Sequence, residues 1–356
     1  MKVLIAFPER KTNTNPFAYT LKDGLENIGC DVSMGLDEFW KYSDKYDLIH
    51  IHWPDSLVEK WNPTDVEVIF LQKHIEEIKT KAVIIYTRHD IVPHYCNSIN
   101  KLKCYDIVEK NADAIVHLGN YGIPELKEKL QNKRVSHFVI PHHIYDSVYD
   151  NSITQQKARM KLSIPQNKFV VLTFGEYRDA EEAHMVLSGF KEYKNRKKYL
   201  LAPRLRNLFI VKVKSRFSWK WIKNKLVIGK LKLAGINMGR DFVSNDYLPY
   251  YFAAADLVLI QRKVVLNSGN IPMAFLFKKP VIGANIGNMG ELLTETNNVV
   301  FDPNKKGALA NAFSEAEKKL NQGIGNSNYN YAIQFMNINS IAQQYLEVYQ
   351  STLKNK

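Results

Sequence analysis

Short apolar runs alternate with amphipathic segments along almost the whole chain, and this alternation constrains the fold more than any other feature. In the first part of the sequence it predicts strands at 2–7, 31–34, 48–52, 83–86, 114–117 and 136–140, with helices such as 17–28 and 65–80 between them. Strands separated by helices at this spacing form right-handed βαβ units, whose parallel sheet is covered on both faces. The sequence therefore predicts an α/β fold.

The alternation breaks after Pro141, where the polar, turn-forming stretch HHIYDSVYDNSITQQ follows, and then starts again with KFVVLTF at 168–174. The second series predicts helices at 180–193, 247–254, 306–321 and 329–352. It predicts further strands at 207–212, 241–244, 257–260, 280–283 and 299–301. A chain of 356 residues is long enough for two domains.

We therefore expect two Rossmann-like domains facing a cleft, the first over residues 1–148 and the second over 149–328. A C-terminal helix over 329–356 is expected to return to the first domain. In such sheets ligands bind beyond the carboxyl ends of the strands, so the strand-to-helix loops are where functional residues are expected.

Several common kinds of site have no sequence signature here. The chain contains neither G-x-G-x-x-G nor G-x4-G-K-[ST], which disfavours a dinucleotide enzyme and a P-loop nucleotidase. Cys30, Cys96 and Cys104 are odd in number and unrelated in spacing, which disfavours a disulfide framework or a zinc cluster and fits the cytosol. The apolar run at 3–7 is too short for a signal peptide, and no run is long enough to span a bilayer.

The sharpest candidates in the first half follow the fourth predicted strand, in YTRHDIVPHY. Arg88, His89 and Asp90 stand where a general base or acceptor-binding groups are expected. Asp90 either deprotonates an acceptor hydroxyl or orients His89. The alternative is a structural ion pair in the loop between Arg88 and Asp90.

Two other loops of the first half supply candidates. In LIHIHWPD, His50 and His52 lie two residues apart and share a face if the strand continues, so each is a site residue or a satisfied core histidine. Trp53 either stacks on a sugar or base or covers the domain core. The loop FPERKTNTNPF is rich in Asn and Thr, and Asn15 is taken from it as a cleft residue.

In the second half, FGEYR follows a β-branched strand and brings Gly175 and Arg178 to its end. Glycine permits close backbone approach, and arginine binds phosphate through a bidentate fork. A second glycine-containing loop, in KKPVIGANIGNMGELL, ends at Glu291. We expect Glu291 at a helix start, where it accepts from ribose hydroxyls or stabilises the helix dipole.

The stretch QRKVVLNSGNIPMAF predicts a turn that enters a helix near Pro272. Free backbone N–H groups at a helix start attract phosphate. The expected phosphate-binding residues of this turn are Asn267, Ser268, Gly269 and Asn270.

The net charge of +13 is concentrated in one segment, because residues 191–232 hold fifteen Lys and Arg against one acid. Aromatic residues interleave with these cations, and 215–233 resembles an interfacial amphipathic element. The expected contacts with an anionic membrane are Trp219, Lys220, Trp221 and Lys223. The alternatives are a solvated basic helix face and a nucleic-acid-binding site. Nucleic-acid binding is disfavoured because the rest of the chain has almost no net charge and contains no recognisable nucleic-acid-binding module.

Taken together, these stretches make the chain resemble the GT-B glycosyltransferases. The group it resembles most is the large one typified by an E-x7-E donor motif. The stretches that carry the resemblance span nearly the full chain in the family's order: NPFAYTLKDGLENIGCDV, DLIHIHW, FGEYR, YLPYYFAAADLVLI and KKPVIGANIGNMGELL. The resemblance implies transfer of a sugar from a nucleotide sugar to a glycan or lipid-linked acceptor, without a cofactor or metal. It also implies a place in surface polysaccharide assembly, peripheral at the inner face of the cell membrane.

One departure concerns the mechanism. The two family glutamates should fall at positions 265 and 273, where this chain has Val265 and Met273, and the family's lysine after the FGxxR stretch is absent. The resemblance therefore leaves retention and inversion open. It also leaves open a non-catalytic protein that binds a nucleotide sugar or a partner.

Overall fold

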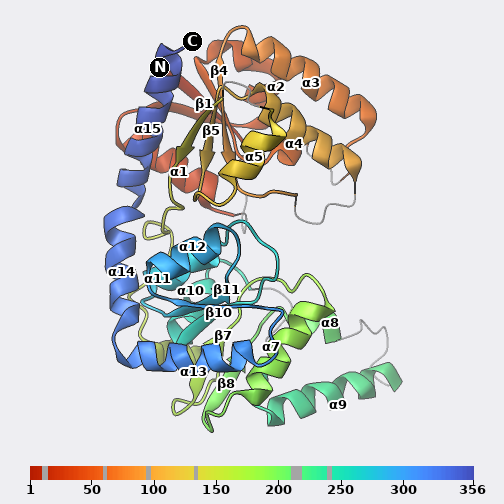
Figure 1. Ribbon diagram of the computed structural model, residues 1–356, viewed down its shortest axis with the longest axis vertical. Coiled ribbons are helices and arrows are strands. Elements are labelled where there is room, and N and C mark those ends of the chain that lie inside the picture. Colours follow the sequence, from red (N-terminus) through yellow and green to blue (C-terminus); the bar gives the residue numbers. More distant parts are fainter. Residues whose placement is uncertain (10–14, 59–61, 94–97, 132–134, 210–218, 239–242) are drawn as a thin grey trace. The chain divides into compact units, whose positions relative to one another are not determined.

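A computed structural model of the chain describes residues 1–9, 15–58, 62–93, 98–131, 135–209, 219–238 and 243–356. These residues form two compact units (Figure 1). The first unit comprises Met1–Val148 and Phe335–Lys356, and the second comprises Tyr149–Gln334. The chain therefore leaves the first unit once and comes back to it.

The first unit is built on six parallel strands in the order β2-β1-β3-β4-β5-β6. Its strands are β1 (Lys2–Ala6), β2 (Asp31–Met34), β3 (Leu48–Ile51), β4 (Val83–Arg88), β5 (Ala114–His117) and β6 (Ser136–Val139). Its helices are α1 (Phe17–Asn27), α2 (Leu36–Tyr42), η1 (Ser43–Lys45), η2 (Pro54–Val58), α3 (Asp65–Lys79), α4 (Ile99–Asn111), α5 (Ile123–Lys129) and α15 (Ile338–Lys354).

Helices cover both faces of this sheet, as the alternating pattern predicts (Figure 1). Alternate residues of the strands point to opposite faces, and each face has its own apolar core. One core packs against α2, α3, α4 and α5, and the other against α1 and α15. Ile341, Tyr345 and Tyr349 of α15 are completely buried. The last helix is therefore part of the first unit's core.

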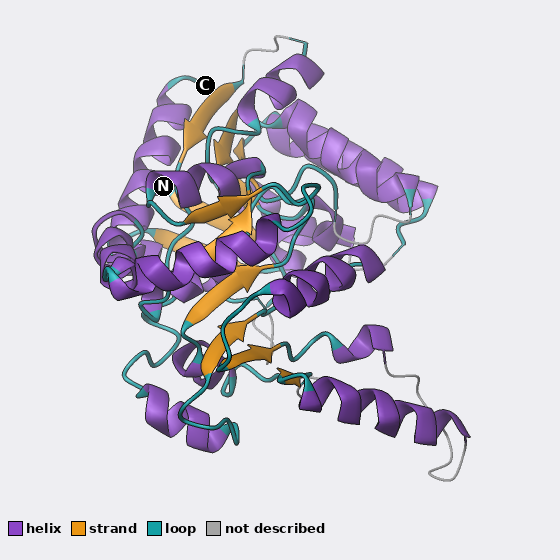
Figure 2. Cartoon of the chain, turned by 60° about the horizontal axis from the view of Figure 1, so that its bottom comes forward, coloured by secondary structure: helices purple, strands orange, loops and turns teal. Residues whose placement is uncertain are grey.

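The second unit also has six parallel strands, in the order β12-β11-β10-β7-β8-β9. The strands are β7 (Phe169–Leu172), β8 (Lys198–Leu201), β9 (Ile236–Asn237), β10 (Leu257–Ile260), β11 (Val281–Ala284) and β12 (Val299–Phe301). The helices are α6 (Gln155–Lys161), α7 (Ala180–Glu192), α8 (Arg206–Phe209), α9 (Trp219–Leu233), α10 (Leu248–Ala254), α11 (Asn270–Leu276), α12 (Gly287–Glu295), α13 (Ala308–Asn321) and α14 (Ile324–Phe335). Helices again lie on both faces of the strands (Figure 2).

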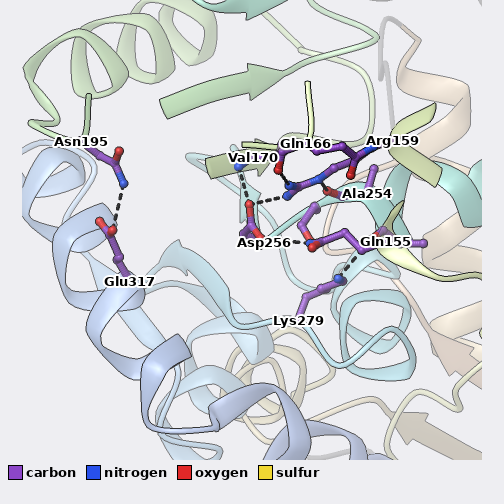
Figure 3. A network of polar contacts seen from close by, with 11 residues as sticks. Gln155, Arg159, Gln166, Val170, Asn195, Ala254, Asp256, Lys279 and Glu317 are labelled. Atoms are coloured by element: carbon purple, nitrogen blue, oxygen red, sulfur yellow. Dashed lines mark hydrogen bonds and ion pairs between the residues drawn. The ribbon is translucent and has the colours of Figure 1, made fainter. Parts of the chain in front are cut away.

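A polar network anchors the amino ends of these strands (Figure 3). Asp256, just before β10, accepts from the backbone N–H of Val170 (2.6 Å) and from Nη2 of Arg159 (2.7 Å). Its other oxygen accepts from the side chain of Gln155 (3.0 Å). This half-buried carboxylate has three partners and is satisfied, so Asp256 fixes α6 and β7 to β10.

Two expected elements are wrong in detail. The strand expected at 207–212 is wrong at its described residues, 207–209, which belong to helix α8. The strand beside β7 is β8, at Lys198–Leu201. The helix expected at 329–352 is two helices, because Asn337 caps α15 by accepting from the N–H of Ser340 (2.9 Å). The strand expected at 241–244 falls partly outside the described residues.

Candidate functional site

Imidazole and indole rings meet at the carboxyl edge of the first unit's sheet. His52 follows β3 and His89 follows β4, and these strands are neighbours. Nδ1 of His52 and Nε2 of His89 share a hydrogen bond of 3.1 Å. The ring of Trp53 stacks on that of His89, with centroids 4.0 Å apart and planes 17° apart. His89 is therefore held on one face and at one nitrogen.

Phe17, the first residue of α1, lies within 4.5–5.5 Å of four imidazole centroids, those of His52, His89, His142 and His143. We call these five residues the imidazole cluster. Burial lowers the pKa of His142 to about 4 and holds the pKa of His52 and His143 well below the usual range. These three rings are therefore neutral at pH 7, and each offers one donor and one acceptor.

His50 belongs to a different network, deeper in the same unit. Its Nε2 bonds Oγ1 of Thr87 (2.8 Å), its Nδ1 bonds the hydroxyl of Tyr349 (2.7 Å), and Thr87 also bonds Tyr345 (3.1 Å). Burial, with a smaller contribution from His89, lowers the pKa of His50 to about 3. His50 is thus a satisfied core histidine that ties α15 to the sheet.

Arg88 also has a structural place, because only 1% of its side chain is exposed. Its guanidinium donates to the carbonyl of Gly122 (2.8 Å), pairs with Glu125 (2.7 Å), and lies 3.4 Å from Glu109. These partners sit on α4 and at the start of α5, so we do not carry Arg88 forward as a ligand-binding residue. Asp90 directly follows His89 and is 7% exposed.

Asn15 is placed at the start of α1. Its Oδ1 accepts a hydrogen bond of 3.1 Å from the backbone N–H of Phe17. Asn15 therefore positions the helix that carries the central ring of the imidazole cluster.

In the second unit, three side-chain nitrogens converge on Gly175, which lies in the loop after β7. A Cβ built on Gly175 would lie 3.2 Å from Nδ2 of Asn270 and 3.9 Å from both Nη2 of Arg262 and Nε2 of Gln261. Gly175 has φ +105°, which side-chain-bearing residues rarely adopt. Nε2 of Gln261 donates to the carbonyl of Gly175 (3.2 Å) and Nδ2 of Asn270 donates to that of Phe174 (2.6 Å), so both amides hold the loop in place. Each amide nitrogen carries a second N–H, and Arg262 adds its guanidinium beside them.

A buried carboxylate joins the loop of Gly175 to the loop that carries these donors. Oε2 of Glu182 accepts from the backbone N–H of Arg178 and from Nη1 of Arg262, both at 2.9 Å. Glu182 is 2% exposed, and Asp179 caps its helix by accepting from its N–H (2.8 Å). Nη1 of Arg178 in turn donates to the carbonyl of Val264 (2.7 Å). The loops after β7 and β10 are thus fixed to each other.

The loop after β11 joins the same edge through a close backbone approach. A Cβ on Gly287 would stand 2.2 Å from the carbonyl oxygen of Val265 and 2.8 Å from that of Leu266, and its φ is +57°. Beside it, Nδ2 of Asn288 donates to Oδ1 of Asn267 (2.9 Å). Loops from three neighbouring strands therefore form one continuous edge.

The starts of two helices differ from expectation. α11 begins at Asn270 with Gly269 as its N-cap, two residues earlier than Pro272, and the carbonyl of Ser268 accepts from Ile271 (3.1 Å). α12 begins at Gly287, so the exposed Glu291 stands one turn inside the helix and not at its start.

Arg262, Gln261 and Glu182 were not among the residues expected from the sequence. The available signal was the triplet QRK directly after the apolar strand LVLI, which places polar side chains at a strand's carboxyl end. The pairing of Arg262 with Glu182 had no such signal, because the two residues are 80 positions apart in the sequence.

Helix α9 contains the four expected membrane-contact residues, at the margin of the second unit (Figure 1). Trp219 is 78% exposed, and Lys220 and Lys223 are exposed. Trp221 is half-buried, with Nζ of Lys225 5.3 Å from its ring centroid.

Within the described part of the chain, no helix combines the length and the apolar character needed to cross a bilayer. The same residues contain no group of three or more His, Cys, Asp or Glu side chains arranged to hold a metal ion.

Neither a family model nor a curated protein matches the sequence. Solved structures do match over nearly the whole chain. HepE of Anabaena in complex with UDP-glucose is 17% identical, with a TM-score of 0.68 over 99% of this chain and 100% of that one. Sucrose-phosphate synthase of Thermosynechococcus elongatus is 14% identical, with a TM-score of 0.67 over 100% of both chains.

WaaG, described as a glycosyltransferase involved in lipopolysaccharide biosynthesis, is 11% identical, with a TM-score of 0.63 over 97% of this chain and 99% of that one. The likeness over nearly the full length of these chains, together with the two six-stranded parallel sheets, confirms the expected GT-B fold.

Proposed function

We propose that the chain is a glycosyltransferase that moves a sugar from a nucleotide diphosphate sugar to a glycan or lipid-linked acceptor. The observation that carries the proposal is the ring of N–H donors around Gly175, at the carboxyl edge of the second unit's sheet. This edge is where parallel sheets bind ligands. Solved structures of similar fold, one of them in complex with UDP-glucose, support a nucleotide sugar as the ligand.

In this proposal the diphosphate lies over Gly175. Nη2 of Arg262 and the second N–H of the amides of Gln261 and Asn270 donate to its oxygens, and Arg178 adds positive charge. Because Nη1 of Arg262 is held by Glu182, the guanidinium is oriented before the ligand arrives. Donors oriented in advance stabilise the charge that develops on a leaving diphosphate, and loss of one such donor costs ~10²–10³ in rate.

On the acceptor side we propose His89 and Asp90. As the acceptor oxygen attacks the anomeric carbon, the bond from that carbon to the diphosphate breaks and the acceptor proton passes to Asp90. The neutral His52 and the stacked Trp53 hold the ring of His89 beside it. Identifying the anomer of the product distinguishes retention from inversion of the sugar's configuration.

We also propose that α9 docks the enzyme on an anionic membrane. Its outward side carries exposed apolar residues at helical spacing, and lysines flank them on both sides. The apolar residues are Trp219, Ile222, Leu226 and Leu233, and the lysines are Lys220, Lys223, Lys225, Lys230 and Lys232. This surface favours a peripheral enzyme of glycolipid or surface polysaccharide assembly at the inner face of the cell membrane.

The central test is turnover with UDP-, GDP- and dTDP-sugars, measured as release of the nucleoside diphosphate in the presence of glycan and glycolipid acceptors. Thermal unfolding with each donor reports binding separately, since a ligand at 100 times its Kd stabilises by ~2.7 kcal/mol. Arg262→Gln should lower kcat/KM by ~10²–10³. Arg196→Gln, at an exposed position between α7 and β8, should leave it unchanged.

Two results would contradict parts of the proposal. Binding of a donor with no turnover on any acceptor indicates the non-catalytic alternative. Full activity of Arg262→Gln refutes the placement of the diphosphate over Gly175.

A further inference from the structure

The second unit contains a cavity of about 1080 Å³ away from the proposed donor site. It lies over β8 and β9, whereas the donor loops follow β7, β10 and β11. The turn after α6, one side of α9 and the segment that leads into α10 complete its walls. The proposed transfer reaction gives this cavity no role.

The charge of the cavity wall has one sign. Lys161, Arg206 and Lys232 line it, and none of the described residues along it is a carboxylate. A smaller cavity of about 510 Å³, between α7 and the segment after β12, is lined by three lysines and three carboxylates and has no such excess. Three cations around a space of this size favour a multiply charged anion.

Tyrosines supply neutral donors beside these cations. The hydroxyl of Tyr199 accepts from Nδ2 of Asn237 (2.9 Å), so its own proton is directed to another acceptor. Nζ of Lys161 lies 5.2 Å from the ring centroid of Tyr247, which holds the ammonium at the wall. Hydroxyl and ammonium donors together match the several acceptor oxygens of a phosphate.

Helix α9 connects the cavity with the surface proposed to dock on a membrane. Ile228 and Lys232 on its inner side line the cavity. Leu226 and Leu233 on its outer side are 60% and 91% exposed. A helix with its side chains is only ~10–12 Å across, so a lipid headgroup beside α9 is within reach of the cavity.

We propose that this cavity binds the phosphomonoester headgroup of an anionic membrane lipid. Such a headgroup carries between one and two negative charges at pH 7, which suits three cations better than the single charge of a phosphodiester. The inference rests on the proposed membrane docking through α9 but not on catalysis. It adds recognition of one headgroup to a general attraction toward negative surfaces.

The test compares binding of the full chain to vesicles of phosphatidylcholine mixed with phosphatidic acid or with phosphatidylserine, at equal surface charge. We expect wild type to prefer phosphatidic acid by on the order of 10-fold. The double variant Lys161→Gln/Arg206→Gln should bind both vesicles equally. The matched control Lys220→Gln/Lys223→Gln, on the outer side of α9, should weaken both and keep the preference.

Each other outcome is decisive. Wild type that binds both anionic vesicles equally, or a cavity variant that keeps the preference, overturns the headgroup site and leaves membrane docking intact. Wild type that binds neither vesicle overturns docking and the headgroup site together. Saturation by soluble glycerol 3-phosphate without any vesicle preference indicates free phosphate instead of lipid. If the double variant unfolds, Tyr247→Phe with Lys161→Gln replaces it and should likewise lose the preference.

Discussion

Replacing Gly287 by alanine tests the close approach on which the donor edge depends. Gly287 has φ +57°, and a residue with a side chain pays ~1–2 kcal/mol for that conformation. The new Cβ would stand 2.2 Å from the carbonyl oxygen of Val265, whereas carbon and oxygen normally approach to ~3.3 Å. The backbone of Val265 must therefore retreat by roughly 1 Å, and overpacking of this kind costs ~1–3 kcal/mol.

The two contributions can be separated within the same unit. Gly323 also has a positive φ, +84°, but a Cβ there meets no described atom within 4 Å. Gly323→Ala should therefore lose only the ~1–2 kcal/mol of conformational strain, and Gly287→Ala should lose ~2–5 kcal/mol. The difference between the two variants in urea unfolding of the second unit measures the cost of the collision.

The functional effect follows from the same movement. Displacing Val265 moves Asn267 and the rest of the loop after β10, and a 1 Å displacement can cost ~10² in catalytic rate. Gly325→Ala provides a second control, because its Cβ would collide with the carbonyl of Lys278 (2.1 Å) instead of the donor loop. It should destabilise the unit with little loss of donor affinity. If Gly287→Ala is no less stable than Gly323→Ala and binds the donor normally, the donor edge is not set by this contact.

Two titratable side chains give further predictions. Because burial lowers the pKa of His50 to about 3 from its ordinary value of 6.5, its contribution to stability is complete above pH 6.5 and falls by ~1.4 kcal/mol per pH unit below it. His50→Gln should lower that slope in urea unfolding between pH 7 and 5, and the exposed His184→Gln should not. Lys279 is the opposite case: burial lowers its pKa to about 8, so the protein should gain stability from pH 8 to 10. Lys279→Met should remove that gain and add ~2 kcal/mol at pH 7, because the charge that burial disfavours costs more than its 3.2 Å bond to the carbonyl of Ala253 returns.

The expected strands were found where apolar, β-branched runs are bounded by polar turns, as in β5, β10 and β12, whose bounds match. β8 was missed because its residues, KYLL, include no β-branched side chain and cations flank it. The break before α15 depends on the cap of Asn337, which hydrophobic periodicity does not show.

The site residues divide in the same way. The meeting of His52 with His89 follows from neighbouring parallel strands, since each residue stands directly beyond its strand. The imidazole cluster also needs His143, from a segment beyond β6, and its contact with Phe17 depends on how that segment folds back. The joining of two loops by Glu182 is likewise a property of the folded unit. Local sequence patterns therefore predicted which residues stand at the carboxyl ends of the strands, but not the contacts between the loops that follow them.

The return of α15 to the first unit has a consequence for synthesis. The helix supplies Ile341, Tyr345 and Tyr349 to a core that is otherwise complete by residue 148, and residues 149–334 must be translated in between. At 5–20 residues per second this takes roughly 10–40 s. During that interval α1 alone can cover this face of the nascent sheet, and the part on which α15 packs stays exposed. The core on that face is completed only when α15 has been synthesised.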